Sequence, residues 1–215
     1  MWNLDTLECV NGLFKGHKDA CLTFQWNNSL IVSGGKDGTL AFWDINRTKP
    51  IKVAKTHKGA VGQIHMFSDG VDANVIISGG TNDGVLAVHD MRTNQLISQE
   101  RAHGGAINFL GSTQSSLIIS GSADKTVKMW DVFSGMQNLG EMQTTDAVFC
   151  GDIYKDILFV GCGDGNMLAF NLDTQECMYG YGADSKGAVE VLKYFEAYNC
   201  VVAGGDSGQL LKINF

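Results

Sequence analysis

Proline and charged residues are scarce in this sequence. It has a single proline, Pro50, and 18% of its residues are charged. Glycine-rich chains that stay disordered or form fibres usually carry an excess of proline, serine or glutamine. Here, in contrast, 27 glycines in 215 residues accompany a hydrophobic content of 44%. Such a chain can fold, and its glycines indicate many tight turns between short strands.

The sequence also lacks closely spaced cysteines and long apolar runs. Its six cysteines are each at least twelve residues apart, which excludes a Cys-x-x-Cys metal or redox pair. No apolar run approaches the ~18 residues of a membrane-spanning helix, and no basic-then-apolar leader begins the chain. These absences favour free thiols over disulfides. We therefore expect a soluble cytoplasmic protein, with the nucleus and the cytoskeleton left open as alternatives.

Positive charge is scarce overall but unevenly placed. The chain has 16 basic and 23 acidic residues, a net charge of −7, which disfavours nucleic acid as a partner. Residues 1–60 contain eight basic and five acidic residues, whereas residues 61–215 contain eight and eighteen. The composition thus predicts a basic sector on an otherwise acidic molecule. No feature points to a membrane.

The strongest signal in the sequence is an internal repeat. Five segments align, and they end at residues 44, 90, 131, 171 and 214. The segments are SGGKDGTLAFWD (33–44), SGGTNDGVLAVHD (78–90), SGSADKTVKMWD (120–131), VGCGDGNMLAFN (160–171) and AGGDSGQLLKIN (203–214). An apolar run precedes each segment, and a histidine lies upstream of the first three: His17, His57 and His103.

This pattern resembles the WD-repeat family, which has a period of ~40–45 residues and a GH…WD signature. The resemblance implies an all-β fold: a β-propeller of five blades, each a four-stranded antiparallel sheet. Residues 1–215 would form a single domain. Residues 1–14 would supply the end of a third strand and a fourth strand, and the repeats would span roughly 15–55, 56–101, 102–143, 144–185 and 186–215.

Local sequence chemistry agrees with short strands and tight turns. The pairs Asp37-Gly38 and Asp83-Gly84 are typical of hairpin turns, because these residue types tolerate positive φ. Residues 20–26 alternate as expected for a strand, with Leu22, Phe24 and Trp26 on one face.

The resemblance also implies a structural tetrad that joins a loop histidine, a serine, a turn aspartate and an inner-strand tryptophan by hydrogen bonds. The matching positions are His17, Ser33, Asp37 and Trp43 in repeat 1, and His103, Ser120, Asp124 and Trp130 in repeat 3. The other repeats depart from the pattern at the tryptophan position, which holds His89, Phe170 and Ile213. Repeat 4 keeps Asp164 but has no clear histidine, and repeat 5 has Ser207 in place of the aspartate.

The two ends of the chain raise the question of ring closure. Residues 2–10 (WNLDTLECV) match residues 170–178 (FNLDTQECM) at six of nine positions, so the chain would open on a fourth strand at roughly 7–14. That strand could complete the last blade and close a ring of five, which would leave no strand edge exposed. The alternative is a five-blade arc of a seven-bladed propeller. We favour the closed ring slightly.

No residue pattern predicts catalysis, a metal or a cofactor. GCGDGN (161–166) resembles a phosphate-binding loop, but a strand and not a helix is expected after it. The histidines show neither HxH nor HExxH spacing. The aspartates recur at the same turn of each repeat, which indicates a structural role. We therefore expect no enzyme, no metal and no cofactor.

Two surfaces are candidates for binding a protein partner. The first is the loop face, where the varying residues near the histidines and turn aspartates are Lys18, Lys36, Lys58, Asn82 and Asp206. The second is the outer edge of the first blade, with Arg47, Lys49, Lys52 and Lys55 and no acidic residue from 45 to 68. Either could bind an acidic or phosphorylated segment, although lysines on an edge strand also simply prevent edge pairing.

The sequence therefore predicts a non-enzymatic scaffold that binds a protein partner within a larger complex. The alternative is a structural segment of a larger propeller protein in a cytoskeletal or ciliary assembly. A third hypothesis is a five-bladed propeller enzyme such as a glycoside hydrolase, which would require carboxylates converging at the channel mouth.

Overall fold

The structure is a computed structural model that describes residues 5–6, 8, 14–27, 30–67, 74–184 and 186–214. Its regular elements are β-strands apart from one 3₁₀ turn, η1 (Glu196–Tyr198). The strands form five antiparallel sheets, each built from consecutive strands, which we call blades 1–5. The all-β expectation with five repeats is thus confirmed. Among the described residues, no helix has the length and apolar character needed to span a membrane.

The blades follow one another along the chain. Blade 1 contains β1 (Cys21–Asn27), β2 (Leu30–Gly35), β3 (Thr39–Asp44) and β4 (Lys52–Lys55). Blade 2 contains β5 (Val61–Met66), β6 (Val75–Gly80), β7 (Val85–Asp90) and β8 (Gln95–Arg101). Blade 3 contains β9 (Ile107–Ser112), β10 (Ile118–Ser122), β11 (Thr126–Asp131) and β12 (Gln137–Gln143). Blade 4 contains β13 (Val148–Tyr154), β14 (Ile157–Cys162), β15 (Asn166–Asn171) and β16 (Cys177–Gly182). Blade 5 has three described strands, β17 (Val189–Phe195), β18 (Cys200–Gly205) and β19 (Leu210–Asn214).

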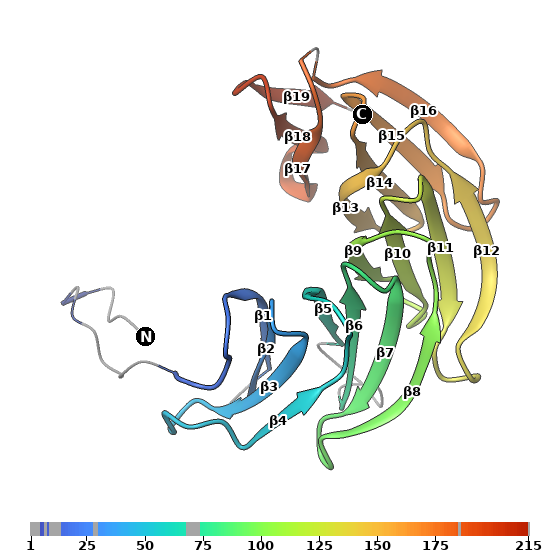
Figure 1. The fold of residues 1–215 in the computed structure, drawn as a ribbon. Helices are drawn as coiled ribbons and strands as arrows, with labels where there is room; N and C mark the ends of the chain where they lie inside the picture. Colours follow the sequence, from blue (N-terminus) through green and yellow to red (C-terminus); the bar gives the residue numbers. More distant parts are fainter. Residues whose placement is uncertain are drawn as a thin grey trace.

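The blades are arranged in an open arc (Figure 1). The first strand of each blade lies on the inner side of the arc, and β1, β5, β9, β13 and β17 contact one another in succession. Blades 1 and 5 lie at the two ends of the arc, so the closure into a five-blade ring that we favoured is not shown. The strand expected at 7–14 falls almost entirely outside the described residues.

Glycines at positive φ make the tight turns between second and third strands. Gly38 and Gly84 have φ of 73° and 62°, a left-handed conformation that other residues adopt at a cost. Both follow the turn aspartates, as the sequence predicted. Blade 3 has Lys125 at the same place with φ of 68°.

The hydrophobic core is divided among the contacts between neighbouring blades. Four clusters of buried side chains each combine residues from two successive blades. Between blades 1 and 2, for example, Leu40 and Phe42 pack against Val61 and Ile64. Since blades 2, 3 and 4 each bury both faces against their neighbours, apolar packing holds successive blades together along the arc.

Candidate functional site

The tetrad of blade 1 forms a continuous hydrogen-bonded relay. The indole N–H of Trp43 donates to Ser33 Oγ at 2.8 Å, and Ser33 Oγ lies 2.7 Å from His17 Nε2. On its other side His17 Nδ1 lies 3.3 Å from Asp37. Asp37 also accepts the backbone N–H of Lys18 at 2.7 Å, so the relay ends by fixing the loop that follows the histidine.

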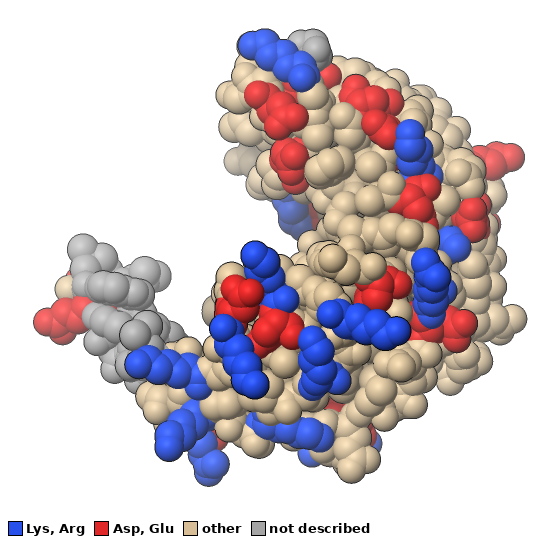
Figure 2. Space-filling model, in the orientation of Figure 1, with Lys and Arg blue, Asp and Glu red and all other residues tan. Residues whose placement is uncertain are grey.

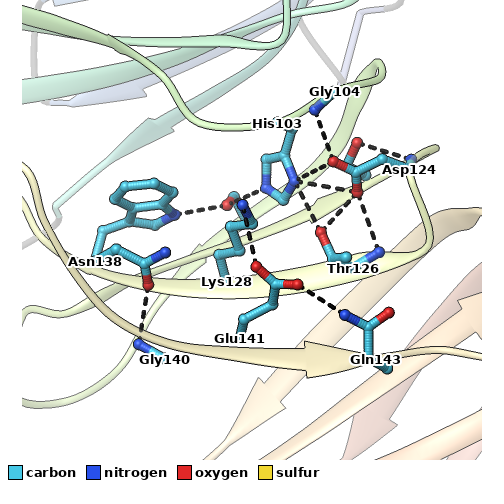
Figure 3. A network of polar contacts seen from close by, with 12 residues as sticks. His103, Gly104, Asp124, Thr126, Lys128, Asn138, Gly140, Glu141 and Gln143 are labelled. Carbon is cyan, nitrogen blue, oxygen red and sulfur yellow. Dashed lines mark hydrogen bonds and ion pairs between the residues drawn. The ribbon is translucent and has the colours of Figure 1, made fainter.

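Blade 3 contains the same relay (Figure 3). Trp130 donates to Ser120 Oγ at 2.9 Å, Ser120 Oγ lies 2.7 Å from His103 Nε2, and His103 Nδ1 lies 3.0 Å from Asp124 Oδ2. Asp124 again accepts a loop N–H, that of Gly104, at 2.8 Å. Because a carboxylate faces Nδ1, this nitrogen carries the ring proton, and Nε2 accepts from the serine hydroxyl.

Burial and hydrogen bonding lower the pKa values of His103 and of the two relay aspartates. Burial lowers the pKa of His103 below its ordinary value of 6.5, although the Asp124 carboxylate opposes the shift. Burial disfavours the ionised form of Asp124, but hydrogen bonds from Thr126 and Gly104 outweigh it and lower its pKa to about 2. Asp37 follows the same balance, with hydrogen bonds from Thr39 and Lys18 outweighing burial and lowering its pKa.

Blade 2 keeps only part of the relay. His57 Nε2 lies 2.9 Å from Ser78 Oγ, and Asp83 accepts the backbone N–H of Lys58 at 2.9 Å. The tryptophan position holds His89, whose Nε2 turns to Thr56 Oγ1 at 3.3 Å. The other ring nitrogen of His89 is buried, and no described residue forms a hydrogen bond with it. Burial lowers the pKa of His89 to about 4, and the neighbouring His57 and Lys52 add to the shift.

Blades 4 and 5 hold the same loops by other means, which the sequence analysis did not identify. In blade 5, Asp184 occupies the histidine position and accepts the backbone N–H of Ser207 at 2.8 Å. The carboxylate thus lies in the loop before the blade, whereas in blades 1–3 it lies in the turn between the second and third strands. In blade 4, hydrogen bonds from Thr145, at the histidine position, and from Asn166 outweigh burial and lower the pKa of Asp164. An alignment of the repeats by position, instead of by residue type, would have identified both Asp184 and Thr145.

A protein-family model recognises two of these repeats. The model described as "WD domain, G-beta repeat" matches residues 8–44 and 94–131, the segments that end in Trp43-Asp44 and Trp130-Asp131. Both contain a complete relay. The chain therefore contains WD repeats.

Several curated proteins are similar to this WD-repeat chain. Mitochondrial division protein 1 of Aspergillus clavatus is 28% identical over 135 residues, which cover 63% of this chain and 19% of that protein. Pre-rRNA-processing protein IPI3 of Yarrowia lipolytica is 26% identical over 182 residues, covering 80% of this chain and 42% of that protein. Human F-box/WD repeat-containing protein 9 is 35% identical over 60 residues, 28% of this chain and 13% of that protein. The chain therefore spans less than half the length of each of these relatives.

The fold is also similar to a solved structure. The crystal structure of the computationally designed Ika8 protein superposes with a TM-score of 0.82 and 26% sequence identity. The match covers 93% of this chain and 60% of that one. The WD-repeat fold is thus present over nearly the whole arc, and the matched chain extends beyond it.

The five loop-face candidates lie on the surface, in the loops and turns beside the relay positions of blades 1, 2 and 5. All five, Lys18, Lys36, Lys58, Asn82 and Asp206, are exposed. Their charge changes along the arc. The residue after the relay histidine is Lys18 in blade 1 and Lys58 in blade 2, whereas Asp146 holds this position in blade 4. Figure 2 shows most of the Lys and Arg side chains on the face in view gathered over the earlier blades.

The loop face of blade 2 is hollowed by a cavity of about 570 Å³. Its lining residues come from the turns and outer strand of this blade: Thr56, Lys58, Gly59, Asn82, Asp83, Val85, Gln99 and Arg101. The carboxylate of Asp83 is occupied by His57 and by the N–H groups of Lys58 and Val85. The side chains of Lys58 and Arg101 form no ion pair among the described residues. The cavity therefore presents two unpaired cations.

Sequence analysis missed Arg101, the second cation of this cavity. It ends β8, the outer strand of blade 2, and the repeat alignment stopped at the third strand. Lys55 ends β4, the outer strand of blade 1. Extending the alignment to the fourth strand would have shown a basic residue at this end in both blades.

The basic edge of blade 1 is more involved in the fold than expected. Lys52 Nζ donates to the backbone carbonyl of Asn94 in blade 2 at 2.6 Å, and Lys55 Nζ donates to that of Asp37 at 2.6 Å. Arg47 lies 3.7 Å from Asp44. Lys49 is exposed. The four cations are not brought together as one unpaired set, because two of them bind main-chain oxygens.

The inner strands line a second cavity of about 290 Å³, with His65, Ser112 and Asp152 among its residues. Its one carboxylate, Asp152, pairs with Lys193 at 2.8 Å and accepts the N–H of Tyr194. This cavity does not present the pair of carboxylates that the glycoside hydrolase hypothesis requires. Among the described residues, no group of three or more potential metal ligands comes together.

Proposed function

We propose that this WD-repeat chain is a protein-interaction scaffold whose loop face, over blades 1 and 2, binds an acidic segment of a partner protein. The observation that carries the proposal is the cavity on blade 2, where Lys58 and Arg101 are unpaired while Asp83 is occupied by the fold. A carboxylate or phosphate group entering this cavity would meet cations without an internal competitor.

The fixed main chain of these loops also supports binding at the loop face. Lys18 and Lys58 are each held by their own backbone N–H to a relay aspartate, at 2.7 and 2.9 Å. A loop whose main chain is fixed loses little conformational freedom when a partner binds. The cytoplasmic location and the complex that would contain the partner stay predictions.

Charge reversal tests the proposal. Affinity purification of the tagged protein from its own cells should give a set of partners that the Lys58→Glu/Arg101→Glu variant loses. Lys49→Glu is the matched control, because it reverses one exposed charge on the outer edge of blade 1 and should leave that set unchanged. Phosphatase treatment of the lysate separates phosphorylated from acidic partners. Retention of every partner by the double variant would refute loop-face binding, and selective loss in Lys49→Glu would favour edge binding instead.

A second candidate function is structural: the chain as one part of a larger propeller assembly. Two observations favour it, the open arc and the match to a longer chain of which it covers 60%. The purified native complex should then contain propeller blades beyond these five, which mass spectrometry of its subunits would detect. A complex that lacks any further blade would refute this candidate.

A further inference from the structure

The four contacts between neighbouring blades repeat one pattern. Each blade presents its second and third strands to the next blade, and we call that side its trailing face. The next blade receives it mainly with its first strand, on what we call its leading face. In the contact between blades 4 and 5, for example, Phe159 and Met167 are trailing residues, and Val189 and Leu192 are leading residues.

A glycine notch on the trailing face receives one side chain of the leading face in each contact. A Cβ placed on Gly34 would lie 2.8 Å from Val61 Cβ, and one placed on Gly121 would lie 3.4 Å from Val148 Cβ. Gly79 meets Ile107 and Gly161 meets Val189 in the same way. Only glycine leaves room for this approach, so the notch is a fixed part of the contact.

The leading face of blade 1 has the same positions, but no other blade of the described chain packs against it. Phe24 lies opposite Ser33 on the neighbouring strand, just as Ile64 lies opposite Ser78 and Leu110 opposite Ser120, so the three residues occupy equivalent positions. Yet Phe24 is 59% exposed, whereas Ile64 and Leu110 are 3% and 9% exposed. Cys21, which holds the position of the notch-filling residues, is also exposed, as are Leu22 and Trp26.

This uncovered leading face contains a cavity of about 360 Å³. Its lining is mostly apolar and aromatic, and it includes Phe14, Phe24, Trp26, Ile31 and Trp43. An exposed apolar surface of this kind marks an interaction site.

The trailing face of blade 5 is also uncovered, and it carries the other half of such a contact. Leu210 pairs with Gly204 as Leu40 pairs with Gly34 and Met167 with Gly161. Leu210 is 78% exposed, whereas Leu40 and Met167 are fully buried. The three heavy atoms nearest to a Cβ at Gly204 belong to Leu210, Val191 and Gln209, all of blade 5 itself, whereas the two nearest atoms at Gly34 and at Gly79 belong to the next blade.

We propose that a second copy of this chain covers these faces, with the trailing face of blade 5 in one copy bound to the leading face of blade 1 in the other. Cys21 would then lie in the notch at Gly204 of the partner copy. This pairing continues an interface that the chain already forms four times, and both halves of that interface are present without a counterpart among the described residues.

One polar difference fits this pairing. Lys212 stands where blades 1–4 have Phe42, Val88, Met129 and Ala169, and its ammonium lies 5.9 Å from the ring centroid of Tyr198. In blade 1, Phe42 faces the ring of His89, which holds the tryptophan position of blade 2. By the same geometry, Lys212 would face Trp43 of the second copy, where its charge can lie against an indole ring.

A head-to-tail contact uses two different surfaces, so it can propagate. Joining copies in this way gives an open series of dimers and longer chains unless the rotation closes. The inference deepens the structural candidate function and is independent of loop-face binding.

Complementation between two variants tests the pairing. By sedimentation, the wild-type chain should increase in mass with concentration, whereas Trp26→Asp and Leu210→Asp should each stay monomeric. An equal mixture of the two should form a dimer that grows no further, because one intact leading face and one intact trailing face remain. Ile97→Asp, which replaces an apolar residue of β8 that is 58% exposed, should self-associate like the wild type.

A cross-link identifies the residues in contact. Under mild oxidation Gly204→Cys should give a disulfide-linked dimer through Cys21, since the equivalent Cβ atoms in the inner contacts are close enough for a disulfide after a small shift. Adding Cys21→Ser should abolish it.

Three results would overturn the inference: a wild-type chain monomeric at all concentrations, self-association by Trp26→Asp alone, or a Cys21 cross-link within one chain. The last would indicate ring closure. A native complex with blades from another protein on these faces would also overturn it, while leaving the structural candidate function intact.

Discussion

Replacing Ser120 by alanine removes the hydroxyl that joins His103 to Trp130 in blade 3. Ser120 is fully buried, and the side chains it joins are nearly so. The substitution would leave two buried groups without partners, the indole N–H of Trp130 and Nε2 of His103. Each such group costs about 1–3 kcal/mol, so we expect Ser120→Ala to lower the free energy of unfolding by about 2–6 kcal/mol.

Blade 2 provides the matched control for this prediction. Ser78 is equally buried and lies 2.9 Å from His57 Nε2, but His89 replaces the tryptophan and does not donate to it. Ser78→Ala therefore leaves one buried group unpaired and should cost only about 1–3 kcal/mol. Guanidinium unfolding of both variants, followed by far-ultraviolet circular dichroism and tryptophan fluorescence, measures the difference. Equal losses in the two blades would refute the view that the tryptophan makes the relay stronger.

Three further predictions concern pH, backbone strain and thiol reactivity. Because burial lowers the pKa of His89 to about 4, the unfolded chain takes up this proton before the folded chain does as pH falls, and the free energy of unfolding should decline by about 3 kcal/mol between about pH 6.5 and pH 4. His89→Phe should flatten that part of a plot of stability against pH, and an unchanged slope would contradict the assignment. Gly165 has φ of 83°, and a Cβ at this position would clash with the backbone carbonyl of Asp184. Gly165→Ala should therefore lower the free energy of unfolding by about 1–3 kcal/mol, measured by thermal unfolding, whereas Gly182→Ala should be near neutral because the space around Gly182 is open. Burial raises the pKa of the Cys150 thiol to about 12, whereas Cys177 is exposed. Alkylation at pH 8, followed over time by mass spectrometry, should therefore modify Cys177 well before Cys150, and the reverse order would be inconsistent with this burial.

The repeats made most of the fold predictable, because the information is local. A turn aspartate and glycine, an apolar run before them and a histidine upstream specify one blade, and the relay residues follow from the same alignment. The angle between blades is not local. It results from the packing of side chains such as Phe42 against the next blade, so the sequence could not decide between a ring and an arc.

Site prediction was limited in a different way. Lys58 was found because it adjoins a repeat histidine, whereas Arg101 lies on an outer strand with no signature of its own. Asp184 escaped notice because its role is defined by position and not by residue type. The uncovered state of Phe24 depends on a neighbour that is missing in space, which no feature of the strand itself reveals.

The distribution of the relays along the arc suggests what they are for. Blades 4 and 5 form complete contacts without histidine or tryptophan, with Phe170 and Ile213 packed in apolar clusters, so the relay is not needed to hold sheets together. Its distinctive consequence is at the loop, where its aspartate holds the N–H of Lys18 in blade 1 and of Lys58 in blade 2. The complete relay of blade 3 holds the N–H of Gly104 in the same way, so blades 1 and 2 are set apart by the cations that their fixed loops carry and not by the relay itself. A binding surface gains most from rigidity where charged side chains must be ready before the partner arrives, and this is the region we assign to partner binding.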